Sequence, residues 1–179
     1  MGSLVCESYA EAYRKAAGLG ADVPVIGVSH FGSIRSGFNE GRITVLDVGE
    51  ALPFANTLRV YRLTGEQLRR LVDFGLHNRR YGWLQTGWLQ TERGDDGHVI
   101  RLFYVGPDGK RQALADDARC YLVADEFITT GGDGYATDLF PQAQEIDAQA
   151  LPATTDAFIQ YLDTFDVLPL ERLDTDPNS

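Results

Sequence analysis

The stretch TLRVYRLTGEQLRRLVDFGLH, residues 57–77, decides the fold class because a strand pattern in it is followed at once by a helix pattern. In the first half, apolar residues alternate imperfectly with Arg59 and Arg62, which is typical of a strand with one solvent-exposed face. In the second half, apolar residues recur at helical spacing after Thr64, a residue type favoured at helix N-caps. We therefore predict a strand that leads directly into an amphipathic helix.

Patterns of the same two kinds occur along the rest of the chain. They predict a helix at 8–17, a buried strand at 23–32, a hairpin of 82–93 with 98–106, a second tight turn at 107–109, a strand at 120–129 and a helix at 154–165 capped by Thr154 or Thr155. The near-repeat LQTGWLQT, residues 84–91, is interpreted as alternation within one strand. Interleaved helices and hairpins predict an α+β class with mixed α/β layers. We expect one domain over 1–173 and a polar tail, disordered, at 174–179.

Composition limits the classes of partner. The 16 basic and 26 acidic residues give a net charge of −10, which argues against a nucleic-acid polymer as partner. No apolar run approaches the roughly 18 residues of a membrane helix, so no membrane span is expected. Cys6 and Cys120 could bridge, but two thiols make neither a disulfide framework nor a zinc site. The compartment stays undecided on these grounds.

Known motifs for self-contained catalysis are missing from the sequence. The histidines His30, His77 and His98 stand far apart and form no HxD, HExxH or HxxxH spacing, so no metal held by this chain is expected. A Walker A run, a dinucleotide-binding glycine motif and a GxSxG elbow are also missing. Binding residues are therefore expected in loops that follow or precede strands.

Three such loops contain candidate binding residues. Arg35 in HFGSIRSG suits a phosphate or carboxylate ligand, or simply a surface carboxylate. Phe54 in ALPFAN could stack on a planar ligand or pack in the core. In DEFITTGGDGY, the glycines allow close approach of a ligand, and Asp133 could accept hydrogen bonds from a sugar diol or form part of an Asp-Gly turn.

In this order, the segments IR, GRIT, LPFANTL, LTG and GGDGY resemble the C-terminal domain of the 5'-nucleotidase family, which includes bacterial UDP-sugar hydrolases and animal ecto-5'-nucleotidases. The resemblance covers nearly the whole chain. It implies a substrate-recognition domain whose partner is an N-terminal metallophosphoesterase domain, absent from this sequence, that holds two divalent metal ions and hydrolyses the phosphate ester. It also implies an exported parent protein, periplasmic, secreted or on the cell surface.

The resemblance also implies roles for individual residues. Phe54 and Phe127 correspond to the two aromatic side chains that sandwich the base, and Asp133 to the carboxylate that binds the ribose hydroxyls. Arg35 corresponds to a nearby substrate-binding arginine. Gly131 and Gly132 would admit the sugar beside Phe127. Stacking of this kind contributes on the order of 1–3 kcal/mol per base and tolerates different bases.

One motif departs from the family pattern. The family has Asn followed by three glycines, Ile and Arg, whereas this chain has HFGSIR at residues 30–35. The Asn hydrogen bond must therefore be remade by His30 or lost, and Phe31 and Ser33 hinder close backbone approach. His30 is included as a substrate-site residue for this reason.

Three hypotheses follow. The chain is the nucleotide- or nucleoside-binding domain of a 5'-nucleotidase-type hydrolase in nucleotide catabolism, with no catalytic residue of its own and no turnover alone. Alternatively, it is a non-catalytic binding or interaction module with the same fold and a degenerate nucleotide site. A third, weaker possibility is a self-sufficient hydrolase that uses acidic residues and a divalent ion.

Overall fold

The computed structural model describes residues 1–78, 80, 82–148, 151–169 and 172. The predicted polar tail at 174–179 lies outside them. The helices are α1 (Gly2–Ala16), α2 (Val45–Ala51), α3 (Gly65–His77), α4 (Glu126–Thr129) and α5 (Thr154–Leu162), with single 3-10 turns η1 (Phe31–Ser33), η2 (Gly132–Gly134), η3 (Thr137–Leu139) and η4 (Gln142–Gln144). The strands are β1 (Val25–His30), β2 (Leu58–Thr64), β3 (Leu84–Gly87), β4 (Leu89–Arg93), β5 (Val99–Val105), β6 (Arg111–Leu114), β7 (Arg119–Asp125) and β8 (Glu145–Ile146).

The strands form two sheets. The larger has the order β3-β1-β7-β2-β8, in which β1 and β7 run parallel and the other neighbouring pairs run antiparallel. The smaller is the antiparallel sheet β4-β5-β6. This mixture confirms the predicted α+β class. Within the described part of the chain, no helix has the length and apolar character needed to cross a membrane.

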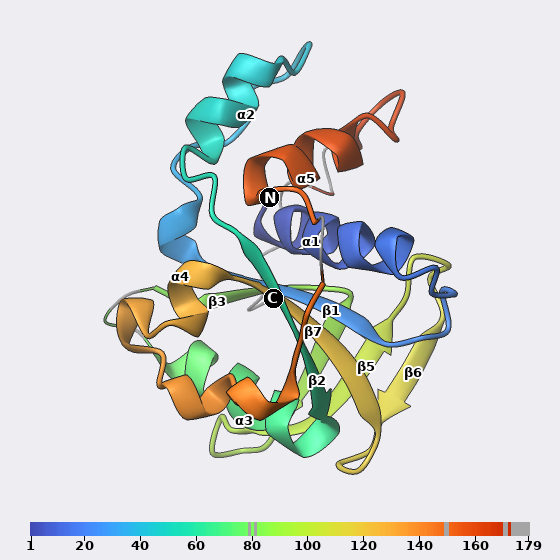
Figure 1. Cartoon of the computed structure of the whole chain (residues 1–179), viewed down its shortest axis with the longest axis vertical. Coiled ribbons are helices and arrows are strands. Elements are labelled where there is room, and N and C mark those ends of the chain that lie inside the picture. Colours follow the sequence, from blue (N-terminus) through green and yellow to red (C-terminus); the bar gives the residue numbers. More distant parts are fainter. Residues whose placement is uncertain (79, 81, 149–150, 170–171, 173–179) are drawn as a thin grey trace.

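Helices cover both faces of the larger sheet. Figure 1 shows α1 and α5 side by side on one face and α3 on the other. The buried core follows from this layering, because β1 is buried along its whole length and α1 and α3 each turn an apolar stripe toward the sheet. Helix α2 stands apart at the end of the molecule, where it contacts α5.

Helix α3 begins where the sequence predicts. The Thr64 hydroxyl accepts from the backbone N–H of Gln67, and the Gln67 side chain accepts in return from the Thr64 N–H. This reciprocal capping satisfies two backbone donors that would otherwise have no partner. Because Thr64 is also the last residue of β2, the strand passes into the helix without a loop.

The predicted hairpins are confirmed, but the near-repeat at 84–91 is not one strand. Its first half is β3, in the larger sheet, and its second half is β4, in the smaller one. Trp88 separates them with a left-handed backbone, φ 58°. A residue in this conformation breaks the extended chain, so that two similar tetrapeptides enter different sheets.

The predicted cap of the last helix is wrong. Helix α5 begins at Thr154, its N-cap is Ala153, and no side chain caps it. The Thr154 hydroxyl instead donates to the carbonyl oxygen of Phe54, and the backbone N–H of Asn56 donates to the same hydroxyl. The threonine therefore fastens the 52–57 loop to α5. At the other end of the chain, α1 begins at Gly2, earlier than predicted.

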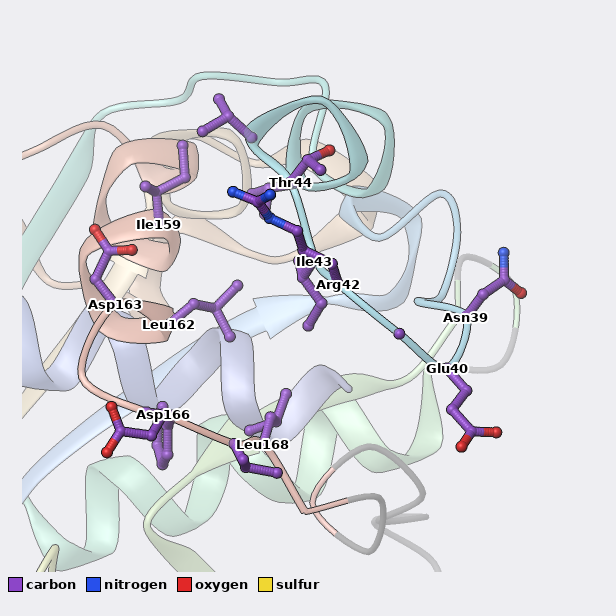
Figure 2. A pocket seen from close by; sticks show the side chains of 15 residues that line it. Asn39, Glu40, Arg42, Ile43, Thr44, Ile159, Leu162, Asp163, Asp166 and Leu168 are labelled. Atoms are coloured by element: carbon purple, nitrogen blue, oxygen red, sulfur yellow. The ribbon is translucent and has the colours of Figure 1, made fainter.

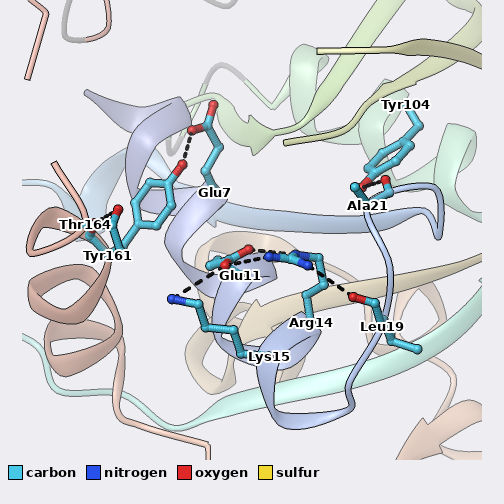
Figure 3. A network of polar contacts seen from close by, with 9 residues as sticks. All are labelled: Glu7, Glu11, Arg14, Lys15, Leu19, Ala21, Tyr104, Tyr161 and Thr164. Carbon is cyan, nitrogen blue, oxygen red and sulfur yellow. Dashed lines mark hydrogen bonds and ion pairs between the residues drawn. The ribbon is translucent and has the colours of Figure 1, made fainter. Parts of the chain in front are cut away.

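Polar contacts hold α1 against its neighbours, as Figure 3 shows. The Tyr161 hydroxyl of α5 donates to Glu7 Oε2 at 2.9 Å. Burial raises the pKa of the Glu7 carboxyl above its ordinary value. On the same helix, both Glu11 oxygens accept from Arg14 at 2.7 Å, and Arg14 also donates to the carbonyl oxygen of Leu19 beyond the helix end. These contacts fix α1 to α5 and to the turn that leads into β1.

The two cysteines are both free and buried. Cys6 lies in α1 and Cys120 in β7. Burial raises the pKa of the Cys6 thiol well above its ordinary value and that of the Cys120 thiol to about 12. The possible bridge between them is therefore not formed, and neither thiol is activated as a nucleophile.

Candidate functional site

Three loops meet at one end of the larger sheet, where strands β1 and β7 finish. The parallel strands β1 and β7 end at His30 and Asp125, so the segments that follow them leave the sheet on the same side. Strand β2 runs antiparallel to β7, and Leu58 at its start pairs with Asp125. The 52–57 loop therefore enters at the same end. The sequence-predicted binding segments are brought to one end of the sheet by this topology.

Phe127 lies in α4, directly after β7. Asp125 caps this short helix by accepting from the N–H of Ile128 at 3.2 Å. The Phe127 ring is 41% exposed. Gly132 lies against it, since a Cβ atom placed there would come within 2.5 Å of the ring, and Gly131 has a left-handed φ of 100°. Both glycines are thus required by the local backbone.

Asp133 is held in an uncommon conformation. Its backbone is left-handed, with φ 51° and ψ 30°, a region that Asp enters more readily than most residues. Its carbonyl oxygen accepts from the Asn78 side-chain amide at 2.9 Å, which joins this loop to the end of α3. The side chain turns toward β1, where Asp133 Oδ2 lies 2.7 Å from His30 Nδ1.

His30 contacts both of the principal predicted binding residues. Its buried ring stacks on Phe127 with the ring centres 4.9 Å apart and the planes inclined at 30°. The Nδ1 atom is close to the Asp133 carboxylate but is not aligned as a hydrogen bond. One face of Phe127 and one carboxylate oxygen of Asp133 are therefore occupied by the protein itself.

Arg35 and Phe54 lie at the same end of the sheet but outside this cluster. Arg35 is exposed, and its guanidinium donates to the carbonyl oxygen of Gly32 at 3.3 Å. Its backbone N–H donates to Ala51, which links the two loops. The Phe54 ring is 51% exposed, and within the described part of the chain it stacks on no other ring. The structure thus brings together His30, Phe127 and Asp133 and leaves Phe54 separate.

A buried polar layer lies beneath these residues. The hydroxyls of Ser29 and Ser33 are 2.7 Å apart, and Ser29 also donates to Asp125 Oδ2 at 3.3 Å. Burial raises the pKa of Asp125, while the charge of His30 acts in the opposite direction. Sequence reasoning missed Ser29 and Asp125, although polar residues within continuous apolar strands were the available signal.

A second group of side chains was also missed. Asp73 and His77 in α3 lie beside His98, in the turn before β5, and together they form a cluster in which two of the three histidines meet. None of the HxD, HExxH and HxxxH spacings includes an Asp followed four residues later by a His, which is the arrangement of Asp73 and His77. An Asp and a His four residues apart on a predicted helix was the available signal, because such a pair lies on one helix face.

A hollow of about 590 Å³ lies elsewhere, between the 39–45 segment and the end of α5. In Figure 2, Ile43, Ile159 and Leu162 line its interior, with Glu40 and Asp166 toward its rim. It shares no lining residue with the cluster of His30, Phe127 and Asp133. It is therefore not part of the candidate site.

Comparison with known proteins agrees with this architecture. Residues 1–140 match the 5'-nucleotidase C-terminal domain family. The chain is 32% identical over 118 residues to a trifunctional nucleotide phosphoesterase protein of Bacillus subtilis. The aligned region covers 62% of this chain and 8% of that protein. It resembles the crystal structure of a 5'-nucleotidase precursor from Thermus thermophilus with a TM-score of 0.75 and 27% identity, over 94% of this chain and 33% of the other.

A more distant likeness supports the fold alone. The structure of the NAD nucleotidase of Haemophilus influenzae matches with a TM-score of 0.69 at 18% identity. The match covers 90% of this chain and 30% of the nucleotidase chain. The chain therefore spans a third or less of these relatives. Because the family match extends over most of its length, the chain belongs to the 5'-nucleotidase C-terminal domain family.

Proposed function

We propose that this chain is the nucleoside-recognition domain of a 5'-nucleotidase-type phosphoester hydrolase. The observation that carries the proposal is the convergence of the 30–35, 52–57 and 126–135 segments at one end of the larger sheet. They bring exposed aromatic rings, a carboxylate and an arginine to that end. Clefts at the ends of strands, lined by aromatic and a few polar groups, are the usual place for small-molecule recognition.

The chemistry of these groups suits a nucleoside. Phe127 and Phe54 each present an exposed ring on which a base can stack. Asp133 offers acceptor oxygens to two adjacent ribose hydroxyls. Arg35 is exposed and positive, which suits a phosphate or another anionic group. Gly131 and Gly132 carry no side chain that would obstruct the sugar, while Gly132 itself packs against the Phe127 ring.

Hydrolysis is assigned to a different part of the parent protein. Two divalent metal ions on an N-terminal metallophosphoesterase domain would polarise the phosphate and activate water. This domain's contribution would be binding energy from the nucleoside, which positions the phosphate at those ions. The chain alone is then expected to bind nucleoside or nucleotide without turning it over. A parent protein located outside the cytoplasm fits this role.

Isothermal titration of the chain with adenosine, AMP and UDP-glucose tests the proposal. Binding of at least one ligand is expected, and Phe127→Ala should weaken it by the stacking contribution of about 1–3 kcal/mol. Phe103→Ala is the matched control, since Phe103 is a partly buried ring in the smaller sheet. Folded protein that binds none of the three ligands at millimolar concentration would contradict the nucleoside role.

A second candidate is favoured by the contacts of His30. Its ring covers one face of Phe127, and its Nδ1 atom engages Asp133. A domain whose stacking face and ribose acceptor are both occupied by its own histidine could serve as a non-catalytic binding or interaction module. In that case wild-type protein fails to bind nucleosides, and removal of the His30 ring restores binding.

A further inference from the structure

A cluster of potential metal ligands lies on the α3 side of the molecule, away from Phe127. Asp73, His77 and His98 each offer one ligand atom, and these three atoms lie within 4.8 Å of one another. Asp73 and His77 are four residues apart on α3, so both side chains point from the same helix face. His98 approaches from the turn between β4 and β5.

The carboxylate of Asp73 is already oriented toward His98. Asp73 Oδ2 lies 2.9 Å from His98 Nδ1, and Asp73 Oδ1 accepts from the backbone N–H of Val99 at 2.8 Å. The turn that contains His98 is held as well, since the backbone N–H of His98 donates to Asp96 Oδ1 at 3.0 Å. Partners of this kind are what hold ligands in place at metal sites.

The imidazole of His77 is oriented by its own helix. Its Nδ1 lies 2.7 Å from the backbone carbonyl oxygen of Asp73, so that Nδ1–H donates there and Nε2 keeps its lone pair. The same tautomer is common among metal-bound histidines, because a carbonyl oxygen takes the second ring N–H. The rings of His77 and His98 lie 4.7 Å apart, so both imidazoles border the same space.

The surroundings leave room for an ion and its water molecules. An open hollow of about 560 Å³ is lined by Asp73, His77 and His98 together with Arg70, Phe74, Asn78 and Leu139. The one cation among these residues, Arg70, reaches away to within 3.8 Å of Asp138. The side chains of His77 and His98 are 45% and 58% exposed.

The ligand set selects the class of ion. Two imidazoles and one carboxylate suit zinc and the neighbouring divalent transition ions, whereas magnesium and calcium prefer oxygen ligands. With bonds of about 2.1 Å, ligands of a tetrahedral zinc ion lie roughly 3.4 Å apart. The three ligand atoms, now within 4.8 Å of one another, would have to converge on the ion, with metal bonds replacing the contact between Asp73 Oδ2 and His98 Nδ1, and a water molecule would complete the shell.

We infer that Asp73, His77 and His98 form a zinc-class divalent metal site that joins α3 to the β4–β5 turn. The site is separate from the proposed nucleoside-binding residues, and it contains no residue assigned to them. An ion bound here would cross-link two elements that pack together beside the larger sheet. Its expected effect is stabilisation of the fold by preferential binding to the folded chain.

The test is a titration of the full chain with Zn²⁺ in competition with a chromophoric chelator, repeated with Co²⁺ and read from its visible absorption. One ion per chain is expected, with a rise in Tm on addition of Zn²⁺ and none with Mg²⁺. His77→Ala and His98→Ala should each weaken Zn²⁺ binding at least about tenfold and remove the Tm shift. Circular dichroism confirms that each variant is folded.

The matched control is His30→Ala, which removes the third histidine outside the cluster and should leave Zn²⁺ affinity unchanged. Asp73→Asn is a further variant, but it also alters the contact with Val99, so the histidine variants decide. The inference is overturned if wild-type protein binds Zn²⁺ no more tightly than the folded double variant of His77 and His98. It is equally overturned if His30→Ala causes the same loss as those variants.

Discussion

Gly27 of β1 and Gly87 of β3 are paired across the sheet, and the backbone of α1 lies directly on both. A Cβ atom at Gly27 would lie 1.7 Å from the carbonyl oxygen of Cys6, and one at Gly87 would lie 2.3 Å from the backbone nitrogen of Glu7. Two glycines thus form a flat patch that lets a helix approach the sheet more closely than side chains would allow.

Gly27→Ala is expected to destabilise the protein by about 3 kcal/mol or more, because the new methyl group meets helix backbone that cannot move aside. Urea unfolding at equilibrium measures the change. Gly49→Ala is the matched control, since nothing lies within 4 Å of a Cβ atom in that helical position. The control should be neutral or stabilising by about 0.5–1 kcal/mol. Equal stability of the two variants would contradict the packing described above.

His30→Asn is expected to raise affinity for adenosine. The change removes the ring that stacks on Phe127 and frees Asp133 Oδ2. A stacking gain of about 1.4 kcal/mol corresponds to a tenfold lower Kd, measured by isothermal titration. His98→Asn, in the metal cluster, should leave the adenosine affinity unchanged. A weaker affinity in His30→Asn would show that His30 supports nucleoside binding, and an unaltered affinity would show that His30 does not obstruct it.

The cysteines are expected to resist thiol reagents in the native state. Both Cys6 and Cys120 are buried, and burial raises the pKa of each thiol. Reaction with a chromogenic disulfide reagent at pH 8 should be on the order of 100-fold slower than in denaturant, where two thiols per chain react. Rapid native reaction of either thiol would mean that α1 or β7 opens readily.

Asp125→Asn is expected to change the pH dependence of stability. Burial raises the pKa of Asp125 in the folded state, so the stability that protonation provides is present below the unfolded-state pKa and lost as pH rises through the folded-state value. Asn keeps an oxygen that can accept from the Ile128 N–H and carries no charge, while its amide NH2 replaces the oxygen that accepts from Ser29. The free energy of unfolding of the variant, measured relative to that of wild type, should therefore increase between about pH 3 and pH 7.

Urea unfolding at intervals across this range measures the difference. The charge of His30 lowers the pKa of Asp125, so replacing Asp125 in a His30→Asn background should give a larger pH-dependent gain over the His30→Asn single variant than the same replacement gives over wild type. A difference between variant and wild type that does not change with pH would mean that Asp125 has an ordinary pKa in the folded protein.

Local signals in the sequence predicted the framework of the fold. Thr64 caps α3 as expected, and the Pro-Asp-Gly turn joins β5 to β6, because both outcomes depend on neighbouring residues. Thr154 shows the limit of this reasoning. Its hydroxyl binds the carbonyl oxygen of Phe54, 100 residues away in the chain, rather than its own helix. Trp88 is similar, since it has a positive φ, which its residue type does not favour, at the junction between strands of two different sheets.

The candidate site was predicted as a set of residues but not as a set of contacts. The sequence marked His30 as a departure from the family pattern, yet its stacking on Phe127 depends on the pairing of β1 with β7. The meeting of His77 with His98 likewise depends on how the smaller sheet packs on α3. Contacts between distant segments require the topology, which single-residue patterns do not contain.

Asn78 lines the hollow beside His77, and its amide holds the carbonyl oxygen of Asp133. One side chain thus connects the proposed metal cluster with the proposed ribose acceptor. Thermodynamic linkage makes any influence between two such sites mutual. Whatever factor zinc imposes on nucleoside affinity, the nucleoside must impose on zinc affinity, so the strength of this communication can be measured from either ligand.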